Sequence, residues 1–224
     1  MSDVSRPTGE AASPGPRRDW GGKRAAILAG ARVVFGREGY AGAGIDAIAA
    51  EAGASTRTIY NHFQDKETLF GAAVRDSSIQ VRDRLIAAVR RHPDRVGDLE
   101  ADLIALARAW VDVTVECAEH FALVRQLNVA AGQFPGELID EWRAVGPDAA
   151  RAELARYMAL LIARGQLADG DPERIARYFH LLAFAEINER AAAVEGRLED
   201  AEITKILTAG VRAFLYGQLS GRAS

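Results

Sequence analysis

A glycine-marked turn between two short helical patterns constrains the fold of this chain more than any other feature. Apolar residues recur at helical spacing from Ile45 to Ala52, and Gly53 follows them. Glycine readily adopts the left-handed conformation that a tight turn after a helix requires. Ser55 then offers a side-chain oxygen that can cap the next helix. The pattern predicts a helix-turn-helix within residues 45–63, and it makes DNA binding the leading hypothesis.

The second of these helices has one face for packing and other faces that stay free. Ile59 and Phe63 lie four residues apart, so they share one face. The residues left mainly on the other faces are Thr56, Arg57, Tyr60 and Asn61. In the major groove, Arg suits guanine, Asn suits adenine and Thr suits a thymine methyl. Arg57 is therefore the first candidate for reading a base.

At these residues the chain resembles the TetR family of transcriptional regulators. The positions that match the family pattern are Ala49, Ala52, Gly53, Ser55, Thr58, Ile59, Tyr60, His62, Phe63, Lys66 and Glu67, preceded by Ile27, Ala31, Phe35, Gly39 and Tyr40. The match runs in one register from about Lys23 to Phe70. A looser match, from Phe121 to Asp169, resembles the AefR-like subgroup of this family.

The resemblance implies which residues meet DNA. Tyr60, His62 and Lys66 should contact phosphates, and Thr56, Arg57 and Asn61 should face the groove, since phosphate contacts position the protein and base contacts specify the site. The full predicted set is Gly44, Ser55, Thr56, Arg57, Thr58, Tyr60, Asn61, His62 and Lys66. Gly44 departs from the family, which usually has Ser or Thr there, and it offers no hydroxyl for that contact.

Several of these residues also have ordinary structural interpretations. Tyr60 could pack against the first helix, and His62 could cap or bridge locally. Lys66 could be a surface lysine, but a cation is unfavourable at a helix start, which favours an external anion as its partner. Arg57 and Asn61 could be solvated surface residues.

Periodic apolar segments of helical length dominate the chain and alternating strand patterns are missing, so the predicted class is all-α. We expect a disordered basic arm at residues 1–18, a three-helix DNA-binding domain at 19–70, and a helical ligand-binding and dimerisation domain at 71–220. In the arm, Arg17 and Arg18, with Lys23 and Arg24 after them, could contact DNA or form a solvated tail. The first helix is predicted from about Gly22 to Glu38, stopping at Gly39.

Charge, cysteine content and hydropathy predict where the protein is found in the cell and which part of it meets DNA. The net charge is −3, but residues 1–66 hold nine Lys or Arg and seven acids, which leaves +2 on the DNA side and −5 on the rest. A single cysteine, Cys117, excludes an internal disulfide and suits a reducing compartment. No signal peptide or membrane span is recognisable, so we expect a soluble cytoplasmic protein.

Beyond residue 66, the pattern predicts a long helix from Lys66 to about Arg91, which joins the DNA-binding domain to the rest. Gly146-Pro147 should interrupt a later helix, and Gly165 should end it. The last two helices have wide apolar stripes that include Ile175, Tyr178, Phe179 and Leu182 in one, and Ile203, Leu207, Val211, Phe214 and Leu219 in the other. Such stripes predict a homodimer built on residues 172–219, which would read a palindromic operator.

A small-molecule effector is implied by the resemblance, and no cofactor or metal is expected. Large aromatic residues would form the wall of its pocket and polar ones its anchors. The candidates are Trp110, Phe121, Arg125, Asn128, Phe134, Trp142, His180, Phe184 and Asn188. For the aromatic residues, ordinary core packing is the competing interpretation. For Arg125 and Asn128, the cost of burying them without partners favours a ligand.

Two other classes of protein remain open. An enzyme built on a di-metal bundle would need repeated Glu-x-x-His pairs, which this chain lacks; Glu116 and His120 form only a lone i, i+4 pair. Cys117 shows no sign of activation. The other class is a ligand-binding or scaffolding dimer without DNA binding, which Gly44 alone suggests. Repression and activation are not distinguished.

Overall fold

The computed structural model describes residues 20–91, 98–193 and 198–218, and the predicted basic arm lies outside them. The described residues form helices and connecting turns without strands, which confirms the all-α class. The α-helices are α1 (Trp20–Gly42), α2 (Ile45–Glu51), α3 (Thr56–His62), α4 (Lys66–Arg90), α5 (Leu99–Glu116), α6 (Ala118–Val129), α7 (Gly136–Arg143), α8 (Ala149–Ala163), α9 (Pro172–Ala193) and α10 (Asp200–Gln218).

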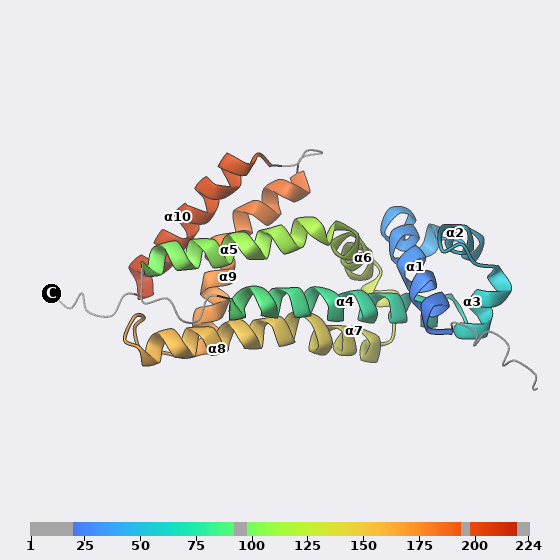
Figure 1. The fold of residues 1–224 in the computed structure, drawn as a ribbon, viewed down its shortest axis with the longest axis horizontal. Coiled ribbons are helices and arrows are strands. Elements are labelled where there is room, and N and C mark those ends of the chain that lie inside the picture. The colour runs from blue at the N-terminus through green and yellow to red at the C-terminus, as the bar shows by residue number, and fades with distance from the viewer. Residues whose placement is uncertain (1–19, 92–97, 194–197, 219–224) are drawn as a thin grey trace, which may run out of the picture.

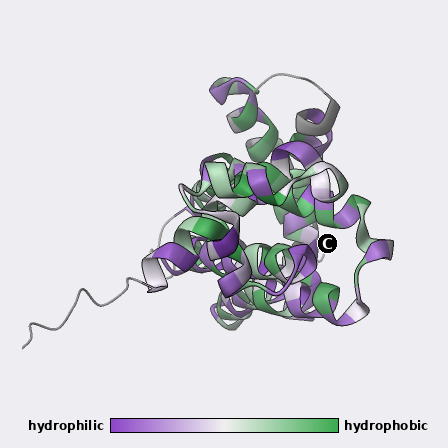
Figure 2. Ribbon diagram, turned by 90° about the vertical axis from the view of Figure 1, so that its right-hand side faces the viewer, coloured by the Kyte–Doolittle hydropathy of each residue, from purple (hydrophilic) through white to green (hydrophobic). Residues whose placement is uncertain are grey.

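The molecule has a small head and a larger body (Figure 1). Helices α1–α3 form the head at one end, and α4 runs from the head along the body beside α8. Helices α9 and α10 pair with each other next to α5 at the far side. Seen from the head end, the helices carry both hydrophobic and hydrophilic residues, as amphipathic helices around a shared interior do (Figure 2).

The first helix bends where the sequence predicted its end. Gly39 has φ 76° and ψ 167°, a conformation that glycine adopts without a side-chain clash. The first helical segment therefore ends at Gly39, as predicted, and a short further helical turn continues to Gly42. The helix also begins at Trp20, two residues earlier than predicted.

An aromatic cluster joins the head to the body. Phe70 of α4 stacks on Phe134 with ring centroids 4.7 Å apart, and it meets Phe35 of α1 edge-on at 5.0 Å. Leu123 and Leu127 of α6 are fully buried in the same cluster. This hydrophobic core therefore includes residues from both the head and the body. Helix α4 continues through residue 70, and the domain boundary expected there stays a proposal.

A second core fills the body between α4, α5, α8, α9 and α10. Its fully buried members include Leu103, Leu106, Leu154, Met158, Phe179 and Phe214. Leu85 and Val89 of α4 are also buried there, and so is Ile175 from the predicted apolar stripe of α9.

The regular α-helix is interrupted at Gly146-Pro147, as predicted, although the chain stays helical there. A π-helical turn at Ala144–Asp148 connects α7 directly to α8. A proline lacks the backbone N–H of a regular helix, and the wider π turn accommodates it. Gly146 is buried against α4, where a Cβ atom would lie 3.1 Å from the Cβ of Ser78. Gly146 thus serves close packing of this turn on α4.

Polar contacts hold α1, α4 and α6 together beside the aromatic cluster. Arg32 of α1 pairs with Glu119 of α6 at 3.1 Å. His120 Nδ1 lies 3.0 Å from Ser77 Oγ, and Ser77 donates to the Val74 carbonyl. Glu116 pairs with Arg84 instead of His120, so the Glu116 and His120 spacing noted in the sequence does not produce a paired site. Burial, and then the nearby Arg32 guanidinium, lower the pKa of His120 to about 4.

We expect this histidine to make the fold acid-sensitive. The unfolded chain binds a proton near pH 6.5 and the folded chain near pH 4, so stability falls as the pH drops through that window. The free energy of unfolding should decrease by about 1 kcal/mol more in wild type than in His120→Gln between pH 7 and pH 5.5. Urea denaturation of both proteins at the two pH values measures this, and equal decreases would contradict it.

Candidate nucleic-acid interface

The turn between α2 and α3 has the geometry that its sequence predicted. Gly53 has φ 60°, in the left-handed region. The Ser55 side chain accepts a hydrogen bond from the Thr58 amide at 3.1 Å, and the two hydroxyls lie 2.8 Å apart. Ser55 is therefore the N-cap of α3, as expected. These contacts fix where α3 begins and so fix the direction in which its side chains point.

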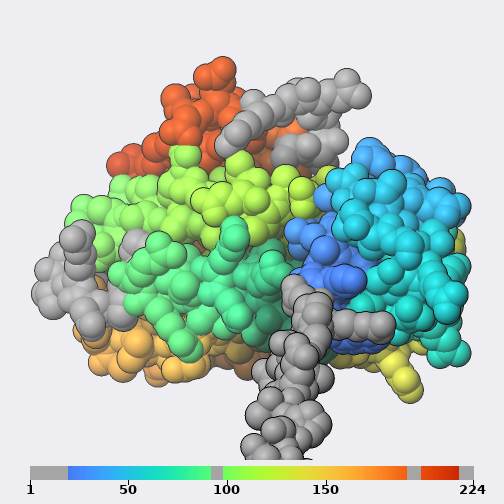
Figure 3. Space-filling model, turned by 45° about the vertical axis from the view of Figure 1, so that its right-hand side comes forward, coloured from blue at the N-terminus to red at the C-terminus, as the bar shows by residue number. Residues whose placement is uncertain are grey.

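Helix α3 presents a buried face and an exposed face. Ile59 and Phe63 are almost fully buried, while Arg57 and Asn61 are exposed and Tyr60 is 56% exposed. Together with α2, this helix forms the cyan end of the molecular surface in Figure 3. The predicted division between a packing face and a free face is confirmed as geometry, and the assigned DNA contacts stay predictions.

The start of α2 departs from the family pattern without strain. Gly44 is its N-cap in an extended conformation with φ −96°, and no side chain caps the helix there. A Cβ atom at Gly44 would meet no other atom within 4 Å, so the glycine is not required by packing. The backbone amides of this helix start can still bind a phosphate.

The three predicted phosphate ligands lie in different environments. Tyr60 is 56% exposed, so more than half of its side chain is available to a phosphate. The His62 ring lies 4.4 Å from the ring of Trp20, a contact that the sequence did not predict. Lys66 Nζ donates to the Ala41 carbonyl at 3.3 Å and lies 5.0 Å from the Tyr40 ring centroid. Lys66 therefore ties the start of α4 to the end of α1.

Three of the predicted ligand-binding residues come together in the body. The Trp110 ring lies 6.0 Å from that of His180 and 5.9 Å from that of Phe184, and the last two are 5.1 Å apart. Burial, and then Arg151, lower the pKa of His180. Trp110 and Phe184 are buried in the second core, so this group of rings contributes to core packing.

Two other predicted aromatic residues are engaged elsewhere. Phe134 is stacked on Phe70 in the core between head and body. Phe121 is partly buried, beside His120 with ring centroids 5.0 Å apart. Phe121 packs against the core that also contains Trp110 and Phe184, whereas Phe134 belongs to the aromatic cluster between head and body, so the predicted aromatic residues are divided between two cores.

The expected burial of the polar anchors is wrong. Arg125 and Asn128 are exposed on α6, because the face of this helix that packs inward carries Leu123 and Leu127. Asn188 is exposed on α9. The argument from costly burial therefore does not apply to these residues, and they carry no evidence for a ligand.

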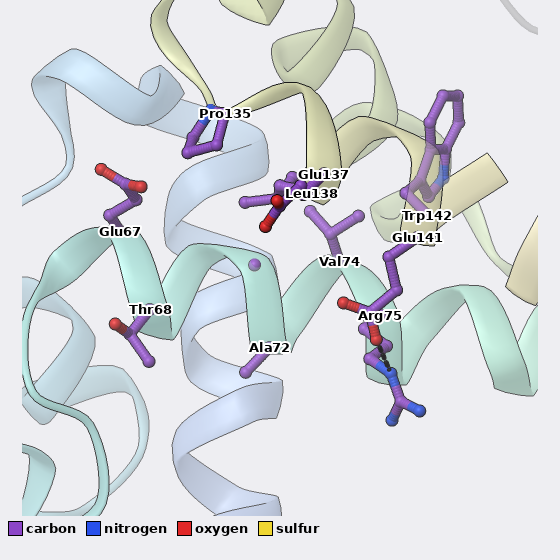
Figure 4. A pocket seen from close by; sticks show the side chains of 11 residues that line it. Glu67, Thr68, Ala72, Val74, Arg75, Pro135, Glu137, Leu138, Glu141 and Trp142 are labelled. Atoms are coloured by element: carbon purple, nitrogen blue, oxygen red, sulfur yellow. Dashed lines mark hydrogen bonds and ion pairs between the residues drawn. The ribbon is translucent and has the colours of Figure 1, made fainter. Parts of the chain in front are cut away.

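A cavity that the sequence did not predict lies between α4 and α7. Its volume is about 390 Å³, and Figure 4 shows its lining, in which Arg75 pairs with Glu141. Trp142 is the one predicted ligand-binding residue among its lining residues. Leu138 approaches α4 where Gly71 lacks a side chain, 3.0 Å from the position of a Cβ. No short sequence motif signals this cavity, since it forms between segments at least sixty residues apart.

The described part of the chain offers no cluster of three or more His, Cys, Asp or Glu side chains arranged to hold a metal. Among the same residues, none of the helices combines the length and apolar character needed to cross a membrane. Cys117 is partly buried at the end of α5, and Arg84 Nη1 lies 3.3 Å from its sulfur.

Comparison with known proteins agrees with this geometry. The family model of bacterial regulatory proteins of the tetR family matches residues 27–73, and that of the AefR-like transcriptional repressor C-terminal domain matches residues 101–217. A solved structure from Mesorhizobium loti, described as a TetR-family transcriptional regulator, is 31% identical. It matches over 90% of this chain and 99% of its own, with a TM-score of 0.79.

Two further relatives are more distant or shorter matches. The flavonoid-responsive regulator FrrA is 26% identical over 91% of this chain and 100% of its own, with a TM-score of 0.67. The HTH-type transcriptional repressor AcnR of Corynebacterium diphtheriae is 35% identical over 81 residues, which are 33% of this chain and 43% of AcnR. The chain thus spans less than half the length of this curated relative.

Proposed function

The chain belongs to the TetR family of bacterial regulatory proteins, and we propose that it is a homodimeric repressor of transcription. The dimer would bind a palindromic operator and dissociate from it when a small molecule binds to the protein. The observation that carries the DNA-binding part is the exposed face of α3. Arg57, Tyr60 and Asn61 project from a seven-residue helix whose other face is fixed in the core by Ile59 and Phe63.

The unpartnered apolar surface of α9 and α10 supports a homodimer. Tyr178, Leu181 and Leu182 of α9 are 44%, 53% and 46% exposed, and Tyr216 of α10 is 76% exposed. Large apolar side chains gathered on two adjacent helices are typical of protein interfaces. The same pair in a second copy would bury them in a four-helix contact, and a two-fold dimer matches a palindromic site.

The descriptions of two relatives support a response to a small molecule and repression rather than activation. FrrA is described as flavonoid-responsive, and AcnR is described as a repressor. In this chain α4 is continuous from the head into the body, so a change in the body can move the head. An effector would have to bind the conformation in which the heads are wrongly spaced for DNA more tightly, by a few kcal/mol, than the conformation that binds DNA.

We expect the affinity for DNA to depend steeply on salt. The head presents Lys23, Arg24 and Arg57 as exposed cations, and each phosphate that a cation neutralises contributes about −0.9 to the slope of log K against log salt. Fluorescence anisotropy with a labelled duplex at several salt concentrations measures the slope. A flat dependence would favour the alternative function, a ligand-binding or scaffolding dimer without DNA binding.

A further inference from the structure

A hollow lies between the start of α1 and the exposed side of α3. Its volume is about 250 Å³, and its lining residues are Trp20, Lys23, Thr58, Asn61 and His62. Two of them come from the first turn of α1 and three from α3, so the hollow exists only because α1 packs beside α3. It adjoins the reading face of the head, since Asn61 belongs to both.

The lining of the hollow suits an anion. It contains one ammonium, an imidazole, an amide and a hydroxyl, and no carboxylate. The Lys23 side chain is exposed, and it has no ion pair with any acid in the described residues. Lys66, in contrast, already donates to the Ala41 carbonyl and lies over the Tyr40 ring. Among the described residues, Lys23 thus has no acidic partner that would compete with a phosphate.

Trp20 gives the hollow a wall. Its side chain is 53% exposed, which is unusual for so large an apolar group, and its ring lies 4.4 Å from the His62 ring at an interplanar angle of 49°. This contact limits the orientations of His62. The indole also carries an N–H donor that can reach a phosphate oxygen.

We propose that this hollow binds one phosphate group of the DNA backbone in each half-site, with Lys23 as its cation and Trp20 as the residue that positions His62. The inference rests on the proposed function and deepens it, because it assigns Lys23 to one phosphate in a defined hollow and adds Trp20 to the DNA-binding surface. A backbone phosphate beside the groove read by Arg57 fixes the register of α3 without reading sequence.

The test compares Lys23→Gln with Arg143→Gln, which removes an exposed cation from α7 in the body. With a duplex that wild type binds, Lys23→Gln should make the salt slope less steep by about 1.8, which corresponds to one phosphate in each of two half-sites. It should weaken binding to all sequences alike. Arg143→Gln should leave the slope unchanged. Thermal unfolding verifies that both variants are folded.

Methylphosphonate substitution then locates the phosphate. Each phosphate of a half-site is replaced in turn by its neutral analogue, and one position should weaken binding of wild type but leave binding of Lys23→Gln unchanged. Trp20→Ala should weaken binding without changing the salt slope, and Trp20→Phe should restore most of it by keeping an aromatic wall.

The outcomes separate this inference from the proposed function. If wild type binds no duplex, both fail. If wild type binds but Lys23→Gln keeps the full salt slope, or if every methylphosphonate affects the two proteins equally, only the phosphate hollow is wrong. If Trp20→Ala binds like wild type, Trp20 does not position His62.

Discussion

Replacing Arg57 by alanine should weaken binding to the operator by about 1–3 kcal/mol for each half-site and should relax base preference at one symmetric position. Arg57 lies in the first turn of α3, is exposed, and is held in place by a helix whose start is fixed by the Ser55 cap. An arginine there can form two parallel hydrogen bonds with a guanine edge, and alanine forms none. Titration of the operator, and of duplexes altered at one symmetric position, measures both effects.

Arg57→Lys is the matched control for charge. A lysine keeps the positive charge but loses the planar fork, so it should retain the salt dependence of wild type and lose the discrimination between bases. If Arg57→Ala discriminates between operators as well as wild type does, Arg57 is a solvated surface residue and another side chain reads the groove.

Gly210→Val should separate α9 from α10 and abolish the dimer. A Cβ atom at Gly210 would overlap the Leu182 carbonyl and lie 2.9 Å from Ala183 Cα, so the backbone of α9 occupies the space that a side chain needs. Forcing extra atoms into such a contact costs about 1–3 kcal/mol or more, and the upper end is expected here because backbone cannot move aside as a flexible side chain does. Because the exposed apolar residues of α9 and α10 form the proposed dimer surface, operator binding should be lost as well.

Sedimentation gives the oligomeric state of this variant, and thermal unfolding gives its stability. Gly21→Ala is the control, because a Cβ at Gly21 meets nothing within 4 Å and alanine favours a helix. It should keep or slightly raise the midpoint of unfolding. A Gly210→Val protein that stays dimeric with an unchanged midpoint would contradict the packing of α9 on α10.

The head was predictable because its signals are local. Gly53 marks the turn, Ser55 caps the next helix, and the spacing of Ile59 and Phe63 assigns the buried face. Each signal involves residues within one or two helical turns, where periodicity and capping determine the structure. The all-α class followed from the same periodicity over the rest of the chain.

Contacts between distant segments were not predictable in this way. Lys66 finds its partner at Ala41, 25 residues earlier, and Phe134 stacks on Phe70 across the boundary between head and body. Gly146-Pro147 predicted an interruption of the α-helix, but the sequence did not show that the interruption is a π turn packed on Ser78. Tertiary packing overrides local propensity at such positions.

The candidate site was predictable only in part for the same reason. The outward residues of α3 follow from its own periodicity, whereas the Trp20 and His62 contact depends on how α1 crosses α3. In the body, Arg125 and Asn128 were expected inside because α6 is mostly apolar, and the phase of the helix placed them outside. The residues predicted to bind the effector were therefore less well supported by the sequence than those predicted to contact DNA.

We propose that the chain reads DNA as a two-fold dimer. Selection of the purified protein against a random pool of double-stranded DNA, followed by sequencing of the bound fraction, tests this most directly. We predict enrichment of one palindrome, with half-site centres spaced by a whole number of helical turns. Absence of any enriched sequence at moderate salt would contradict the claim, and it would make the scaffolding dimer, with its uncapped α2 start at Gly44, the better account.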